Sequence, residues 1–237
     1  MHRLNTPPTT HVPRTRLPWL ALALIAPAPS IGIIAALHLG QGPLGVTLWA
    51  AAKVWLLLLP ALWYLLIERG RISFSPPRHG GLAVGAALGL LISLIIVAAW
   101  WFVGRSAIDP QLIRDKVQAA GLTNPTIYLA GALYWITVNS LLEEYAYRWF
   151  ISRQAERVTG SIAAVFLSAA IFTVHHVIAL TSYMPLWIAI LASLGVFIGG
   201  AAWSWLYIRY RSIWPAYVSH AIVDIAVFAL GYVILFT

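Results

Sequence analysis

The chain has 237 residues, of which 61% are hydrophobic and only 9% are charged, and its mean hydropathy is +0.83. Soluble domains carry about 25% charged residues, so this composition excludes an ordinary soluble globular protein, a disordered chain and a nucleic-acid-binding protein. The formal net charge of +8 is instead typical of a membrane protein with basic cytoplasmic loops. Because the sequence has no cysteine, any chemistry must come from His, carboxylate, Ser or Thr side chains.

Seven apolar runs are long enough to cross a bilayer, whose core needs roughly 20 helical residues. In chain order they cover residues 17–39, 44–67, 80–103, 126–150, 161–183, 185–208 and 213–236. Turn-forming connectors such as Pro76-Pro77 separate them, and neither an internal repeat nor a soluble domain is visible in the sequence. The sequence therefore predicts an all-α fold, a polytopic transmembrane helical bundle that forms a single domain over residues 1–237.

The distribution of basic residues predicts the orientation of the chain. With the N-terminus in the cytoplasm, only Arg105, Arg114 and Lys116 lie outside, and Lys53 lies within the second span. The inner set comprises Arg3, Arg14, Arg16, Arg69, Arg71, Arg78, Arg148, Arg153, Arg157, Arg209 and Arg211. Because cytoplasmic loops are enriched in Lys and Arg, this bias favours a basic cytoplasmic tail over residues 1–16 and an outward-facing C-terminus.

The first apolar run allows a second interpretation. Arg14 and Arg16 precede it, and Ala26-Pro27-Ala28 resembles a signal-peptide cleavage site. A membrane span is favoured, because the run continues past that site to spanning length.

A short amphipathic segment separates the third and fourth runs. Residues 108–120 place Ile and Leu side chains at helical spacing with charged residues between them. This pattern predicts a short helix that lies on the outer membrane interface.

A few ionisable side chains fall inside the predicted spans, where each costs about 2.5–3.5 kcal/mol to insert and is for that reason a functional candidate. They are Lys53, Glu143, Glu144, His175, His176, His220 and Asp224. Glu144 and Arg148 are four residues apart on one helix and can pair, which leaves Glu143 on another face. His220 and Asp224 have the same spacing and can act jointly. The sequence leaves two possibilities for Lys53. It can form an ion pair with Asp224 or Glu144, or it can line a water-filled cavity.

These side chains fit one cavity in the cytoplasmic half of the membrane if the helices tilt. A carboxylate beside an imidazole can activate water, and a second imidazole can stabilise an oxyanion. That combination is typical of amide hydrolysis. Two histidines and a glutamate also form a zinc-type ligand set, although the chain lacks a His-Glu-x-x-His helix. Serine and aspartyl schemes are weakly supported, since no Gly-x-Ser-x-Gly element and no Asp pair in facing spans occurs.

Three motifs occur in order along the second half of the chain. They are Glu143-Glu144-x-x-x-Arg148, Phe172-x-x-x-His176 and His220-x-x-x-Asp224. Together they resemble the motifs of the CPBP family, the CAAX protease and bacteriocin-processing group of intramembrane proteases, which is related to the Ras-converting CAAX endopeptidase. The resemblance covers about residues 105–230, and in the third motif the family has Asn or Asp.

The resemblance implies an intramembrane endopeptidase of the glutamate type. By motif position, Glu143 and His176 would activate the attacking water. His220 and Asp224 would form or orient the oxyanion site. No cofactor and no metal ligand is implied, although a zinc-dependent version of the protease stays open.

The remaining motif residues have supporting roles in this interpretation. Glu144 and Arg148 would support the helix and the site. His175 matches no motif position, which favours a structural role for it. Because an ionised Asp224 cannot donate a hydrogen bond as Asn could, we expect it to orient His220, unless it is protonated.

The expected substrate is a membrane-anchored protein or peptide processed at a CAAX-like sequence, a leader or a C-terminal sorting signal. The lipid bilayer is the other expected partner, and nucleic acid is not. The expected location is the cytoplasmic (inner) membrane of a bacterium, as a multi-pass protein. The alternative is a non-catalytic immunity or scaffold protein of the same fold, whose polar cluster would serve helix packing. The complete motif set favours catalysis, since a scaffold would not require it.

Overall fold

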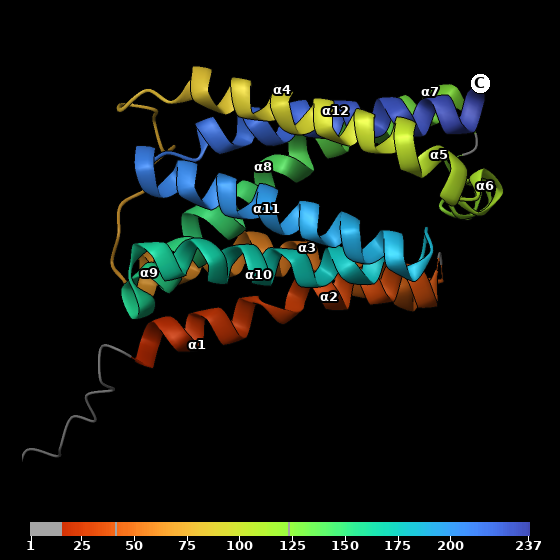
Figure 1. The fold of residues 1–237 in the computed structure, drawn as a ribbon. Coiled ribbons are helices and arrows are strands. Elements are labelled where there is room, and N and C mark those ends of the chain that lie inside the picture. Colours follow the sequence, from red (N-terminus) through yellow and green to blue (C-terminus); the bar gives the residue numbers. More distant parts are fainter. Residues whose placement is uncertain (1–15, 41, 123) are drawn as a thin grey trace, which may run out of the picture.

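A computed structural model describes residues 16–40, 42–122 and 124–237. It is 85% helical, and the described residues contain no strand, which confirms the all-α class. The α-helices are labelled α in Figure 1, and η denotes the π-helical segments between them. The elements are α1 (Arg16–Ile25), α2 (Pro27–Ile34), η1 (Ala35–Leu39), α3 (Pro43–Leu62), η2 (Trp63–Ile67), α4 (Leu82–Ala99), η3 (Trp100–Gly104), α5 (Arg105–Ala107), α6 (Pro110–Ala119), α7 (Pro125–Tyr134), η4 (Trp135–Asn139), α8 (Ser140–Glu143), η5 (Glu144–Ser152), α9 (Arg153–Thr159), α10 (Ser161–Leu180), α11 (Leu186–Tyr210) and α12 (Trp214–Phe236).

Six helices within the described ranges are long and apolar enough to cross a membrane. They are Arg16–Leu39, Pro43–Ile67, Leu82–Ala107, Ser161–Leu180, Leu186–Tyr210 and Trp214–Phe236. They coincide with six of the seven predicted spans, and the chain is a multi-pass membrane protein. The predicted span 126–150 lies in a helix that continues from α7 to α9 and also passes from one end of the bundle to the other (Figure 1). This segment is not among the six, and it contains the polar and charged residues of the first motif.

The first and last described residues lie at opposite ends of the bundle, as expected for a chain that crosses the membrane an odd number of times. Arg16, the first described residue, begins α1 at one end of the bundle, and Thr237 lies at the other (Figure 1). The predicted basic tail otherwise lies outside the described residues. Which end faces the cytoplasm stays a prediction made from the basic residues.

The predicted short helix between the third and fourth spans is α6. Asp109 caps it by accepting a hydrogen bond from the backbone N–H of Gln111 at 2.9 Å, and Pro110 occupies its first turn. None of its residues is buried. Such a helix suits the membrane surface, where its apolar face can contact lipid.

Two small residues let α4 lie directly against α12 (Figure 1). A Cβ atom added to Gly85 would lie 2.1 Å from the Pro215 carbonyl oxygen, and one added to Gly89 would lie 2.7 Å from that of Ser219. The Gly85-x-x-x-Gly89 spacing is the small-residue pattern that brings membrane helices into close contact. This contact fixes the place of α12, the helix that carries His220 and Asp224.

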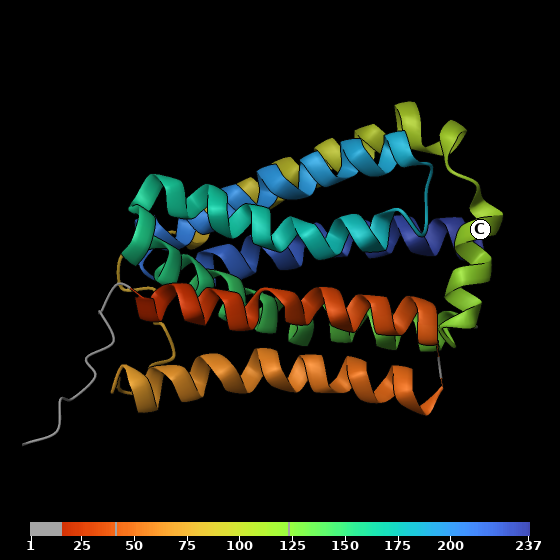
Figure 2. The same cartoon turned by 90° about the horizontal axis from the view of Figure 1, so that it is seen from below.

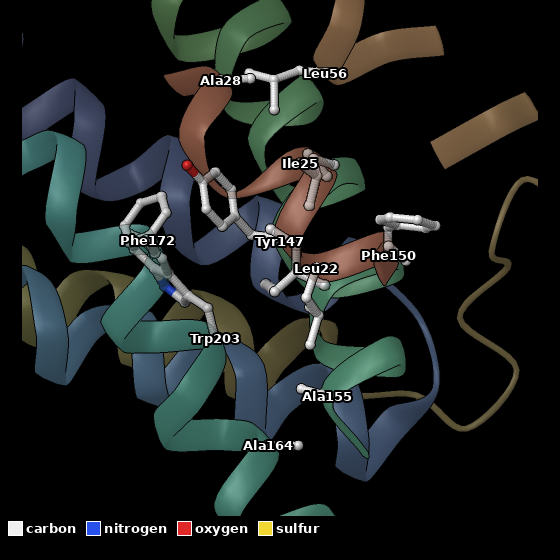
Figure 3. Close-up of a cluster of buried hydrophobic side chains, with 14 of the residues drawn as sticks. Leu22, Ile25, Ala28, Leu56, Tyr147, Phe150, Ala155, Ala164, Phe172 and Trp203 are labelled. Carbon is white, nitrogen blue, oxygen red and sulfur yellow. The ribbon is translucent and has the colours of Figure 1, made fainter. Parts of the chain in front are cut away.

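The buried core lies between the N-terminal helices, η5, α10 and α11, while α3 lies at one edge of the bundle (Figures 2 and 3). Tyr147 and Phe172 contact edge to face with ring centroids 4.8 Å apart, and Trp203 packs beside them (Figure 3). The outer surface exposes large apolar side chains such as Leu94, at 68% exposure. A surface of that kind is stable in lipid and not in water.

Candidate active site

The polar groups of the first motif lie in the middle of the long helix from Pro125 to Thr159. There α8 is only four residues long and is flanked by the π-helical segments η4 and η5. The hydroxyl oxygen of Ser140 lies 2.8 Å from the carbonyl oxygen of Trp135, five residues earlier. Widened helical turns of this kind are frequent at functional sites, because they turn side chains out of the regular register.

Glu144 is the central acceptor of the site. It is fully buried, and its Oε2 accepts a hydrogen bond from Nε of Arg148, which is also fully buried, at 3.2 Å. Its Oε1 lies 2.9 Å from Nδ1 of His220. Because an ionised carboxylate only accepts hydrogen bonds, Nδ1 of His220 carries a proton. Glu144 thus pairs with Arg148 as their spacing predicts, and it also holds His220.

Aromatic rings surround the guanidinium of Arg148. Its central carbon lies 4.7 Å from the ring centroid of Phe172, 5.5 Å from Trp203 and 5.8 Å from Tyr147. Nη1 also donates to Ser204 Oγ at 3.3 Å. Cation–π contacts and the ion pair together offset the cost of burying this charge.

The second ring nitrogen of His220 faces the other two acids. Nε2 lies 3.8 Å from Glu143 Oε2 and 3.7 Å from Asp224 Oδ1, beyond hydrogen-bond length in both cases. The Trp203 ring stacks on the imidazole at 4.1 Å between centroids. The hydrogen bond that fixes the ring is the one that Nδ1 of His220 donates to Glu144, and the expected orientation of His220 by Asp224 stays a prediction. Asp224 accepts a hydrogen bond from Ser140 at 2.5 Å.

Glu143 is held from a direction that the sequence did not predict. Its Oε1 accepts a hydrogen bond from Nδ2 of Asn139 at 2.8 Å. The Oδ1 of Asn139 in turn accepts a hydrogen bond from Nζ of Lys53 on α3. Lys53 therefore pairs with neither Asp224 nor Glu144, and it reaches the site through Asn139. The Glu143 side chain is 12% exposed, whereas that of Glu144 is fully buried.

The adjacent histidines of α10 have different surroundings. His175 is buried, and its Nδ1 lies 3.1 Å from the hydroxyl of Tyr147. Nδ1 of His176 donates to the Phe172 carbonyl at 3.0 Å, which leaves Nε2 as the acceptor of a neutral ring. The centroid of the Phe172 ring lies 4.5 Å from that of His176 and 6.1 Å from that of His220, so Phe172 packs against both imidazoles. Among the described residues, no hydrogen bond joins His176 to Glu143.

Asn139, Ser140 and Trp203 belong to the site but were not identified from the sequence. A signal for the first two exists, because each lies four residues before one of the paired glutamates and so shares its helix face. Trp203 has no such signal, since one aromatic residue in an apolar helix resembles any other. In the part of the chain that the structure describes, no three His, Asp or Glu side chains are grouped so as to hold a metal ion.

Comparison with protein families identifies this region. Residues 124–226 match the family described as type II CAAX prenyl endopeptidase Rce1-like. This match supports the resemblance of the chain to the CAAX protease (CPBP) family. The family is one of CAAX-type intramembrane endopeptidases, and the matched region contains all three motifs. No curated protein and no solved structure matches the chain.

Proposed function

We propose that the protein is an intramembrane endopeptidase that hydrolyses a peptide bond with a water molecule activated by Glu143 and His176. The observation that supports this most directly is the convergence of the first and third motifs, which brings Glu143 within 3.8 Å of His220. A buried acid, Glu144, holds that imidazole at 2.9 Å. Helix packing alone would not require both a buried, ion-paired Glu144 and a partly exposed Glu143 beside His220.

In the proposed first step, a water molecule between Glu143 and His176 loses a proton to the Glu143 carboxylate as its oxygen attacks the scissile carbonyl. Asn139 holds the carboxylate by one oxygen, so the other is available as the base. Nε2 of His176 accepts a hydrogen bond from the second O–H of the water and orients it, and that hydrogen stays on the oxygen. Glu143 then passes its proton to the amide nitrogen, the C–N bond breaks, and the products are an amine and a carboxylic acid.

His220 would stabilise the oxyanion of the tetrahedral intermediate through Nε2. That atom must carry a proton to donate a hydrogen bond, so the ring acts as an imidazolium. The three neighbouring carboxylates favour this charge, and the hydrogen bond to Glu144 fixes the direction in which Nε2 points. Asp224 contributes its negative charge at 3.7 Å while Ser140 holds it in place.

Lys53 acts as a positioning residue in this scheme. An ammonium group only donates hydrogen bonds, so its contact selects the oxygen side of the Asn139 amide. The amide nitrogen must then face Glu143. Lys53 thus determines which way the Asn139 amide points, and the amide in turn holds the Glu143 carboxylate.

The proposed substrate is a membrane-anchored protein or peptide, and the proposed location is a bacterial inner membrane. The test uses the purified protein in nanodiscs with three peptide sets: prenylated C-terminal peptides, leader peptides and C-terminal sorting signals. Mass spectrometry of the products should detect cleavage at one bond in at least one set. If no set is cleaved, and a cellular phenotype of the protein persists in the Glu143→Ala, His176→Ala variant, the alternative of a non-catalytic scaffold or immunity protein holds.

The same assay tests the chemistry. Incubation with a chelator should leave turnover unchanged if the side chains alone activate water. Loss of turnover that zinc restores would support the zinc-dependent version instead.

A further inference from the structure

A hollow lies at the end of the bundle and shares no residue with the site described above. Its volume is about 270 Å³, and its polar lining consists of Ser73, Ser75, Arg78, His79 and Arg211. Three aromatic side chains and Pro76 complete the lining. This is below the roughly 300–1,000 Å³ of pockets for drug-sized molecules, so the cavity suits a compact polar group.

The cavity lies at the depth where membrane helices meet water. Four of its polar residues belong to the connector between the spans that end at Ile67 and begin at Leu82. Arg211 belongs to the connector between the spans that end at Tyr210 and begin at Trp214. Tyrosine and tryptophan are enriched at this interfacial depth, which agrees with the aromatic part of the lining.

The charge of the cavity is positive. Its lining contains two arginines and a histidine but no carboxylate. Arg211 is paired outside the cavity with Glu156, at 2.5 and 2.8 Å, and these hydrogen bonds raise the pKa of the Arg211 guanidinium. Among the described residues, no carboxylate lies within ion-pairing distance of Arg78. Arg78 thus supplies the uncompensated positive charge.

The wall of the cavity is held rigidly. Ser75 has a backbone φ of 53°, a left-handed conformation that a non-glycine residue keeps only when its surroundings hold it. The hydroxyl of Ser212 donates to the Ser75 carbonyl at 2.6 Å, and the Ser75 hydroxyl accepts from the backbone N–H of Ile213 at 3.0 Å. Trp214 donates to the neighbouring Phe74 carbonyl at 2.9 Å. The backbone at Ser75 is therefore preorganised, which reduces the cost of binding.

We infer that this cavity binds a phosphate group, supplied either by the headgroup of an anionic phospholipid or by a soluble phosphate compound. Guanidinium groups match the oxygens of phosphate in charge and geometry, and serine hydroxyls can donate to the same oxygens. Basic pockets between membrane helices near the surface are typical binding sites for anionic headgroups. This inference does not depend on the protease activity.

The experiment measures thermal unfolding of the full chain in detergent by intrinsic tryptophan fluorescence. Three additions are compared at equal ionic strength: short-chain phosphatidylglycerol, phosphatidylcholine with the same acyl chains, and inorganic phosphate. Arg78→Gln tests the cavity, and Arg71→Gln is the matched control, because Arg71 lies in the same connector, is exposed and does not line the cavity. Native mass spectrometry of the same samples counts retained lipid directly.

A ligand at ten times its Kd should raise the Tm of the wild type and of Arg71→Gln by about 3–6 °C. Arg78→Gln should lose most of that rise and most of the retained lipid. A rise with phosphatidylglycerol alone identifies the lipid headgroup, and an equal rise with inorganic phosphate identifies a soluble ligand. The inference is overturned if neither anion raises the Tm, or if Arg71→Gln and Arg78→Gln lose the rise equally.

Discussion

Nδ1 of His220 lies 2.9 Å from a carboxylate oxygen of Glu144, although 76 residues separate the two in the sequence. The contact joins α12 to η5 and so links the first motif to the third. The other oxygen of Glu144 is occupied by Arg148. With both oxygens engaged in buried contacts, Glu144 is a structural acid, and the neighbouring Glu143 is the acid left to react.

Glu144→Gln should destabilise the protein strongly, because it leaves the buried Arg148 charge without its counter-ion. Breaking a buried ion pair by removing one partner costs about 3–5 kcal/mol of unfolding free energy. Glu156→Gln is the matched control, since it removes the partly exposed pair with Arg211 and should cost about 1 kcal/mol or less. Thermal unfolding in detergent measures both. Equal unfolding temperatures for the two variants would contradict the structural role of Glu144.

Lys53→Met should lower kcat by about 100-fold through misplacement of Glu143, with a smaller change in KM. Asn139 would lose the donor that selects its orientation. Lys116→Met, on the exposed helix α6, removes the same charge far from the site and should leave turnover unchanged. Lys53→Arg should keep part of the rate, because a guanidinium group, like an ammonium group, can only donate hydrogen bonds to Oδ1 of Asn139. An unchanged kcat in folded Lys53→Met would contradict the positioning role.

The pair of Glu156 and Arg211 should make stability depend on pH. The hydrogen bonds from Arg211 are the largest influence on Glu156, and they lower its carboxyl pKa below the usual 4.5 in the folded protein. A lowered folded pKa gives stability that is complete above the unfolded pKa and is lost as the pH falls through the folded value. The Tm difference between wild type and Glu156→Gln should therefore be larger at about pH 7 than at about pH 3. A difference that grows on acidification would contradict this pairing.

Gly85→Ala should destabilise the protein and reduce turnover together. The new methyl group would lie 2.1 Å from the Pro215 carbonyl, so α12 must move and shift His220 with it. Overpacking of this kind costs about 1–3 kcal/mol. Gly195→Ala is the matched control, because a Cβ atom there meets nothing within 4 Å. Unfolding temperatures and turnover of both variants, measured side by side, check the prediction; equal behaviour would contradict it.

The sequence predicted the parts of this structure that depend on local patterns. Apolar runs of spanning length predict membrane helices because lipid leaves the backbone few other conformations. The pairing of Glu144 with Arg148 follows from helical spacing. The partners of Lys53 and His220 could not be predicted, because they depend on the rotation and depth of α3 and α12. Those are determined by packing, as at Gly85 and Gly89, and not by the residues themselves.

The central claim is that Glu143 activates the water, and Glu143→Gln tests it most directly. The measurement is turnover of a cleaved membrane-anchored peptide by the purified variant in nanodiscs, with thermal unfolding of the same sample as the check on folding. Glutamine keeps the size of the side chain and its contact with Asn139 but cannot accept the proton. We predict a loss of at least about 10³-fold in kcat with the Tm nearly unchanged. Full turnover in folded Glu143→Gln protein would contradict the account.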